Sequence, residues 1–187
     1  MDASDPTENL TWYNEEMEDC ANGYAAYILE MAEAAKESCA DPKVLFEQRV
    51  DFSRWVEQGF GTADCIIITD GTLRICDYKH GLGVLVDATD NPQMKCYALG
   101  ALELFDDIYD IDNVSMTIYQ PRRQNVSTYE VSKDDLYQWA DEVLKPTATL
   151  RTPDARGHAL HEVDLGPLLI LGKFVALLRG SEAALRR

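Results

Sequence analysis

The sequence of 187 residues lacks any hydrophobic run long enough to cross a membrane. A membrane-spanning helix needs about 20 consecutive, largely apolar residues. The longest apolar run, LLILGKFVALL from Leu168 to Leu178, is shorter and contains Lys173. We therefore expect no membrane partner, and we predict that this run forms a buried or interfacial helix.

Cysteine is scarce and follows no recognisable pattern. The chain has five cysteines, an odd number, and no CxxC pair. Zinc and iron–sulfur sites usually show closely spaced cysteines, and disulfide-bonded secreted proteins usually have an even number. The pattern favours reduced thiols in a cytoplasmic protein, and we expect neither a zinc site nor an iron–sulfur cluster.

Basic residues are few relative to acidic ones. The chain has 17 Lys and Arg against 33 Asp and Glu, which gives a formal net charge of −16. Nucleic-acid binding is driven largely by Lys and Arg that displace counterions from phosphates. A nucleic-acid-binding function would therefore need a local basic surface, a metal ion or a partner segment.

The residues that are present indicate a folded α/β domain. Apolar residues make up 46% of the chain and aromatic residues 9%, enough to bury a core. Apolar positions recur at helical spacing over residues 11–39, and alternating patterns predict strands. The predicted strands comprise residues 44–52, 59–69, 72–79, 114–121 and 126–131.

Two further helices are predicted from their capping residues. Asn91-Pro92 is typical of an N-cap followed by the first helical position, and that helix is predicted over residues 92–107. Ser132 is expected to cap a helix that Pro146 ends. The predicted order is helix, three strands, helix, strand, and then a trailing strand and helix. We place one domain at residues 1–146 and an atypical tail with one apolar helix at residues 147–187.

The hairpin formed by the second and third strands carries an unusual concentration of charge. Asp70-Gly71 between two β-branched runs is a strong hairpin signal. A two-residue turn there places Cys65 opposite Cys76 and Asp64 opposite Asp77, in a pair whose Cα atoms approach to about 4.5 Å. Alternation along the strand places Lys79 on the same face. The three charged side chains are therefore expected to converge at the open end of the hairpin.

Two directly opposed carboxylates repel each other, so something must compensate Asp64 and Asp77. The residues leave three possibilities open: exposure to solvent, Lys79 as a counter-ion, or a divalent cation that bridges the carboxylates. Mg²⁺ suits such a pair because it prefers hard oxygen ligands and completes its shell with water and substrate phosphate. Glu47, on the first strand, is a further candidate ligand, with an exposed strand position as the alternative.

An ordered set of motifs resembles a known nuclease family. GTAD at residues 61–64, DYK at residues 77–79 and a helix with Gln93 and Tyr97 follow one another along the chain. This set resembles the RecB-type branch of the PD-(D/E)XK nuclease superfamily, and it is similar to phage-encoded exonuclease-like proteins of that branch. The resemblance covers roughly residues 13–146, and it implies a restriction-endonuclease-like αβββαβ core with a mixed central sheet flanked by helices.

The resemblance also implies roles for individual residues. Asp64 and Asp77 would bind Mg²⁺ or Mn²⁺, with the backbone carbonyl of Tyr78 as a further ligand. Lys79 would position the attacking water and stabilise charge on the phosphate. Gln93 and Tyr97 lie one helical turn apart and would orient Lys79 or the phosphate.

The chain departs from the pattern of that branch in two ways. The branch usually has a metal-binding histidine on a helix before the first strand, and often a C-terminal cysteine cluster. Here the histidines are His80, His158 and His161, and no cysteine follows Cys96. The domain is thus expected to lack an N-terminal helix that would carry this ligand.

The sequence predicts a Mg²⁺- or Mn²⁺-dependent deoxyribonuclease, an exonuclease of phage or prophage type. Its expected partners are DNA and a phage recombination or replication protein. Arg122-Arg123, at a predicted hairpin tip, is a further candidate for phosphate contact. The alternative is a catalytically degenerate or truncated protein with the nuclease fold that acts as a binding or assembly module. The negative charge and the missing histidine favour that alternative.

Overall fold

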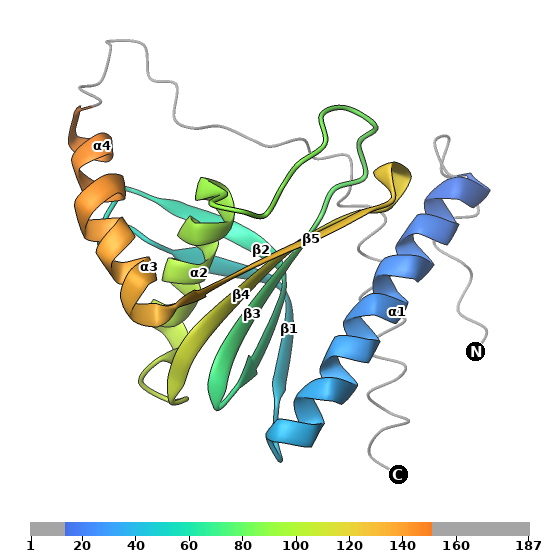
Figure 1. The fold of residues 1–187 in the computed structure, drawn as a ribbon, viewed down its shortest axis with the longest axis horizontal. Helices are drawn as coiled ribbons and strands as arrows, with labels where there is room; N and C mark the ends of the chain where they lie inside the picture. The colour runs from blue at the N-terminus through green and yellow to red at the C-terminus, as the bar shows by residue number, and fades with distance from the viewer. Residues whose placement is uncertain (1–13, 151–187) are drawn as a thin grey trace, which may run out of the picture.

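A five-stranded mixed sheet forms the centre of the structure, and helices cover both of its faces (Figure 1). The computed structural model describes residues 14–150. The strands lie in chain order: β1 (Lys43–Asp51), β2 (Phe60–Thr69), β3 (Gly71–Tyr78), β4 (Ile111–Gln120) and β5 (Asn125–Ser132). Neighbours are antiparallel except β3 and β4, which are parallel. The predicted α/β class, with an αβββαβ order and a mixed sheet flanked by helices, is confirmed.

Helix α1 (Glu15–Ser38) packs on one face of the sheet. It begins at Asn14, whose side-chain oxygen accepts the Met17 backbone N–H at 2.9 Å. Acidic residues in its first turn stabilise the helix, because their negative charge lies at the positive end of the helix dipole. The helix buries Tyr24 and Ile28 in a cluster that also contains Cys65, Ile67 and Cys76 from the sheet. The long amphipathic helix is present as predicted within the described residues.

Helix α2 (Pro92–Phe105) covers the opposite face and connects the parallel strands β3 and β4. Asn91 caps it as predicted, because its side-chain oxygen accepts the backbone N–H groups of Gln93 and Met94. The main core lies under this helix and includes Met94 and Leu99 together with Ile66, Ile75 and Met116. The first turn of α2 lies near the end of β3, since Lys79 donates a hydrogen bond of 3.3 Å to Gln93.

The C-terminal helical segment corrects one prediction. Ser132 caps α3 (Lys133–Trp139) as expected, and its hydroxyl accepts the Asp135 backbone N–H. Pro146 does not end the helix: a π-helical turn (Ala140–Leu144) precedes it, and α4 (Lys145–Leu150) contains it. The wider turn changes the hydrogen-bond spacing just before proline, where a regular helix would lose an N–H donor and clash with the ring.

The described residues contain no helix long and apolar enough to span a membrane. Most of the predicted tail, with its apolar run and the histidines at 158 and 161, lies outside the described residues. The domain boundary predicted at residue 146 falls inside the continuous helical segment. The division into two parts therefore stays a prediction.

Candidate metal centre

The β2–β3 hairpin has the predicted register along most of its length. Paired residues run from Thr69 and Thr72 at the turn to Cys65 and Cys76. At the turn only Gly71 takes a positive φ, +83°, a conformation that glycine adopts without strain. This register leaves the two aspartates, which follow the last pair, at the open end of the hairpin.

The paired ladder ends sooner than predicted. Asp64 and Asp77 are not ladder partners, because the pairing stops at Cys65 and Cys76. Instead, Oδ2 of Asp64 accepts the backbone N–H of Tyr78 at 2.7 Å. A short side-chain acceptor that binds a backbone donor competes with the strand ladder. The prediction that Asp64 and Asp77 pair across the ladder is therefore wrong, although Asp77 lies close enough to raise the pKa of Asp64.

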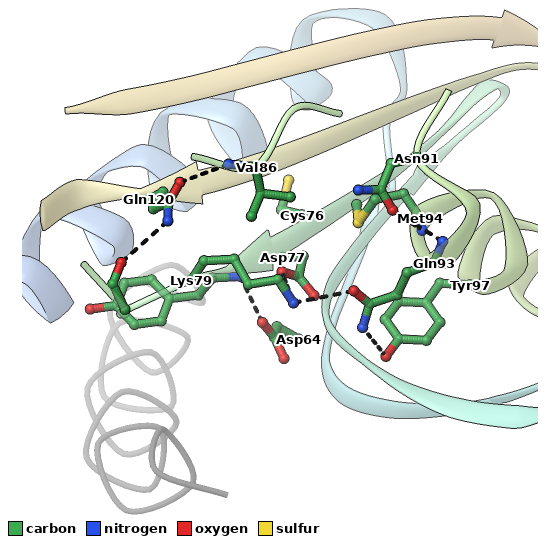
Figure 2. Close-up of polar contacts among 12 residues, drawn as sticks. Asp64, Cys76, Asp77, Lys79, Val86, Asn91, Gln93, Met94, Tyr97 and Gln120 are labelled. Carbon is green, nitrogen blue, oxygen red and sulfur yellow. Dashed lines mark hydrogen bonds and ion pairs between the residues drawn. The ribbon is translucent and has the colours of Figure 1, made fainter. Parts of the chain in front are cut away.

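A chain of polar contacts joins four of the predicted site residues (Figure 2). The Lys79 ammonium lies 2.9 Å from Oδ2 of Asp77 and donates a hydrogen bond of 3.3 Å to Oε1 of Gln93. Nε2 of Gln93 in turn donates to the Tyr97 hydroxyl at 2.9 Å. Asp64 adjoins this chain through its bond to the backbone of Tyr78. Residues from two strands and one helix thus meet at one end of the sheet.

The two carboxylates share an environment that disfavours their charged forms. Burial and the neighbouring Asp77 raise the pKa of Asp64 from 3.8 to about 7. Burial also raises the pKa of Asp77, and Lys79 opposes that rise. Desolvation and a like charge act in the same direction on a carboxylic acid. One ammonium group therefore compensates this pair only in part.

An ion pair lies at the centre of this group. Asp77 is 4% exposed, and its Oδ2 lies 2.9 Å from the Lys79 ammonium. A carboxylate oxygen can accept more than one partner, so this pairing leaves capacity for a cation. The two aspartates offer hard oxygen donors, which fit the preferences of Mg²⁺ and Mn²⁺.

The third predicted carboxylate lies close enough to affect the pair. Glu47 is on β1, between Phe46, which pairs with Cys65, and Gln48, which pairs with Ala63. Its φ of +51° is unusual for a residue within a strand, and its charge adds to the raised pKa of Asp64. Within residues 14–150, no group of three or more Asp, Glu, His or Cys has a metal-binding arrangement. Metal ligation by Glu47 and by the Tyr78 carbonyl stays a prediction.

Gly61 of the GTAD motif makes room for the Tyr97 ring. A Cβ atom built on Gly61 would overlap with Cε1 of that ring and lie 3.1 Å from its Cδ1. Tyr97 holds Gln93, which in turn contacts Lys79. The lack of a side chain at residue 61 thus supports the position of Lys79, which directly follows β3.

Replacement of Gly61 by alanine is expected to destabilise the fold by about 1–3 kcal/mol, because the added methyl group overpacks against Tyr97. Thermal unfolding measures the effect, and Gly83→Ala is the matched control, since a Cβ there meets nothing within 4 Å. In a Tyr97→Ala background the Gly61→Ala change should cost much less, because the obstacle is gone. An equal loss in both backgrounds would show that the ring is not what the methyl group meets.

Two buried polar residues were not predicted. Gln120 is 2% exposed and bonds to the backbone of the β3–α2 loop, and a glutamine at a strand end gives no sequence signal. Lys95 is 5% exposed, with its ammonium 2.7 Å from Asp90 and 4.7 Å from the centre of the Trp139 ring. A lysine at helical spacing with Leu99 and Leu102 is the signal that would have identified it.

The arginines predicted at the β4–β5 turn have protein partners. They lie in a short 3-10 helix, η1 (Pro121–Arg123). Arg122 pairs with Glu16 of α1 at 2.8 Å, and Arg123 donates to the backbone carbonyl of Leu82 at 3.4 Å. Arg122 thus links the turn to α1, and Arg123 links it to the β3–α2 loop.

Residues 2–159 match the family model described as "Protein of unknown function (DUF2800)". The match includes every residue of the candidate centre and the whole described structure. The chain therefore belongs to the DUF2800 family.

Proposed function

We propose that this chain is a nuclease of the PD-(D/E)XK type that uses Mg²⁺ or Mn²⁺ to hydrolyse phosphodiester bonds in DNA, as an exonuclease. One observation carries the proposal: Asp64 and Asp77 lie at one end of the sheet with Lys79, which contacts Asp77 and Gln93. This arrangement suits hydrolysis of a phosphodiester. The two acids can hold a cation, and the lysine, held by a glutamine on the helix, can stabilise charge on the phosphate.

Each residue has a chemical task in this proposal. Asp64 and Asp77 would hold the cation, which supplies positive charge to the phosphate and lowers the pKa of water. Lys79, two residues after Asp77, presents an ammonium group that would stabilise the charge developing on the phosphate oxygens. Gln93 accepts one N–H of that ammonium, and Tyr97 holds the Gln93 amide. These two hydrogen bonds would hold the Lys79 side chain in place if its ion pair with Asp77 weakened.

The net charge of −16 and the lack of a three-ligand group among the described residues favour a second candidate function. In that alternative the fold is kept but the protein acts as a binding or assembly module. The two candidates differ in one measurable property, which is divalent-metal-dependent loss of DNA.

The proposed function predicts that the full chain degrades linear double-stranded or single-stranded DNA with Mg²⁺ or Mn²⁺ and that EDTA stops the reaction. Gel electrophoresis of end-labelled and internally labelled fragments follows the loss. Closed circular plasmid is the control substrate, because an exonuclease needs a free end. If all three substrates stay intact with either metal at low salt, the nuclease proposal is wrong and the binding module is favoured.

A further inference from the structure

The loop that connects β3 to α2, residues 79–91, links two residues of the candidate centre and exposes aliphatic side chains. It begins at Lys79 and ends just before the helix that carries Gln93. Between them, Leu82 is 52% exposed, Val84 83% and Leu85 54%. Large aliphatic residues at this exposure, next to one another, are uncommon on a surface without a ligand. In Figure 1 the loop projects beyond the end of the sheet, beside the β4–β5 turn.

A buried amide holds this loop in place. Nε2 of Gln120 donates to the carbonyls of Gly81 at 3.2 Å and Val84 at 3.1 Å, and its Oε1 accepts the Val86 N–H at 3.2 Å (Figure 2). Asn125 donates to the Val86 carbonyl at 2.9 Å. One enclosed side chain thus satisfies three backbone groups of the loop, which a free surface loop would satisfy with water.

A second group of contacts holds the far half of the loop. The Ser127 hydroxyl accepts the Ala88 N–H at 3.0 Å and donates to Oδ1 of Asp87 at 3.0 Å. Because the backbone is held from both β4 and β5, the exposed aliphatic side chains are not free to fold back onto the core. Burial of each of them elsewhere would stabilise the fold. The loop therefore presents a preorganised apolar surface.

The neighbouring charges indicate what this surface contacts. The Arg123 guanidinium donates to the Leu82 carbonyl, and Lys79, which pairs with Asp77, begins the loop. The acids of the loop, Asp87 and Asp90, follow the exposed aliphatic residues, so the two cations lie at the end of the loop that carries Leu82. Surfaces that bind single-stranded nucleic acid combine cations for the phosphates with side chains, most often aromatic, that pack on the faces of the bases; here aliphatic side chains would take that place.

We infer that residues Leu82, Val84 and Leu85 contact the bases of an unpaired DNA strand whose phosphate lies at Lys79. This inference rests on the proposed function for its substrate. It assigns to the loop a sequence-independent role, because aliphatic side chains meet the face of any base and read no base edge.

The test is binding of a fluorescein-labelled single-stranded oligonucleotide to the full chain in EDTA at low salt, followed by anisotropy. The Val84→Ser/Leu85→Ser double variant is expected to bind about tenfold more weakly than wild type, because two apolar contacts are lost. Val84→Ile should bind as wild type does. Ile108→Ser is the matched control, since Ile108 is also exposed, at 72%, but lies in the loop between α2 and β4.

The hydrolysis assay separates this inference from the proposed function. Weaker binding by the double variant, with Ile108→Ser unaffected, supports the loop surface even where no DNA is degraded. Degradation by wild type with unchanged binding and KM in the double variant leaves the nuclease standing and overturns the loop assignment. The absence of oligonucleotide binding by wild type also overturns it. A shift of wild type, but not of the double variant, to a larger species in gel filtration would assign the loop to self-association instead.

Discussion

Replacement of Lys79 by alanine is expected to lower the rate of DNA hydrolysis in Mg²⁺ or Mn²⁺ by about 10²–10³-fold, the usual effect of losing one group that stabilises transition-state charge. Lys79 is the cation in contact with Asp77 and Gln93, and its backbone N–H is fixed by the carbonyl of Tyr119 at 2.9 Å. Single-turnover degradation of a labelled fragment measures the change. Asp77→Asn should reduce the rate at least as much, because it weakens cation binding as well.

Lys133→Ala provides the matched control for this prediction. Lys133 pairs with Asp106 at 2.9 Å, and its side chain is 24% exposed, close to the 21% of Lys79. Both changes therefore remove a partly buried ion pair, but Lys133 lies on α3, outside the candidate centre. Equal rates in the Lys79→Ala variant and wild type, or equal losses in the two lysine variants, would show that Lys79 has no special part in the reaction.

The fold follows from local signals, which is why it was predictable. The Asp-Gly pair sets a two-residue turn, and the turn then fixes the register of both strands as far as Cys65 and Cys76. Asn91-Pro92 begins α2 through contacts between neighbours in sequence. Period-two alternation is enough to bring Asp77 and Lys79 to one face, and helical spacing to align Gln93 with Tyr97. Those parts of the site that depend on such short-range rules were predicted.

The parts that were missed depend on contacts between distant segments. The ladder ends early because the Asp64 side chain accepts the backbone N–H of Tyr78, 14 residues away. Residue spacing alone does not show whether this hydrogen bond or a further ladder pair is the more stable. Gln120 holds a loop from 34 to 39 residues away in the chain. The helix passes Pro146 because a π-helical turn precedes it, which no residue pattern announces. Contacts between distant segments decide the first two of these cases.

Replacement of Asp64 by asparagine is expected to stabilise the metal-free protein at pH 8 by about 2–3 kcal/mol. The pKa of Asp64 rises from 3.8 to about 7 in the folded state, so the folded protein retains a proton that the unfolded chain releases. The free energy of unfolding of wild type must therefore fall as pH rises from about 4 to 7. The full shift corresponds to about 4 kcal/mol, and the partial solvent contact of Asp64 reduces it. Asparagine stays neutral and keeps an oxygen to accept the Tyr78 N–H.

Denaturant unfolding at pH 5 and pH 8 in EDTA measures this effect, with Asp107→Asn as the control for loss of an exposed carboxylate. The difference between the Asp64→Asn variant and wild type should be clearly larger at pH 8 than at pH 5, where only part of the shift has been traversed. Added Mn²⁺ should raise the melting temperature of wild type at pH 8 and leave that of the variant nearly unchanged, because a ligand stabilises only the state that binds it. A variant that is stabilised without metal and loses its response to metal would show that the two carboxylates destabilise the metal-free fold and bind the cation. Parallel pH profiles for the two proteins would contradict that explanation.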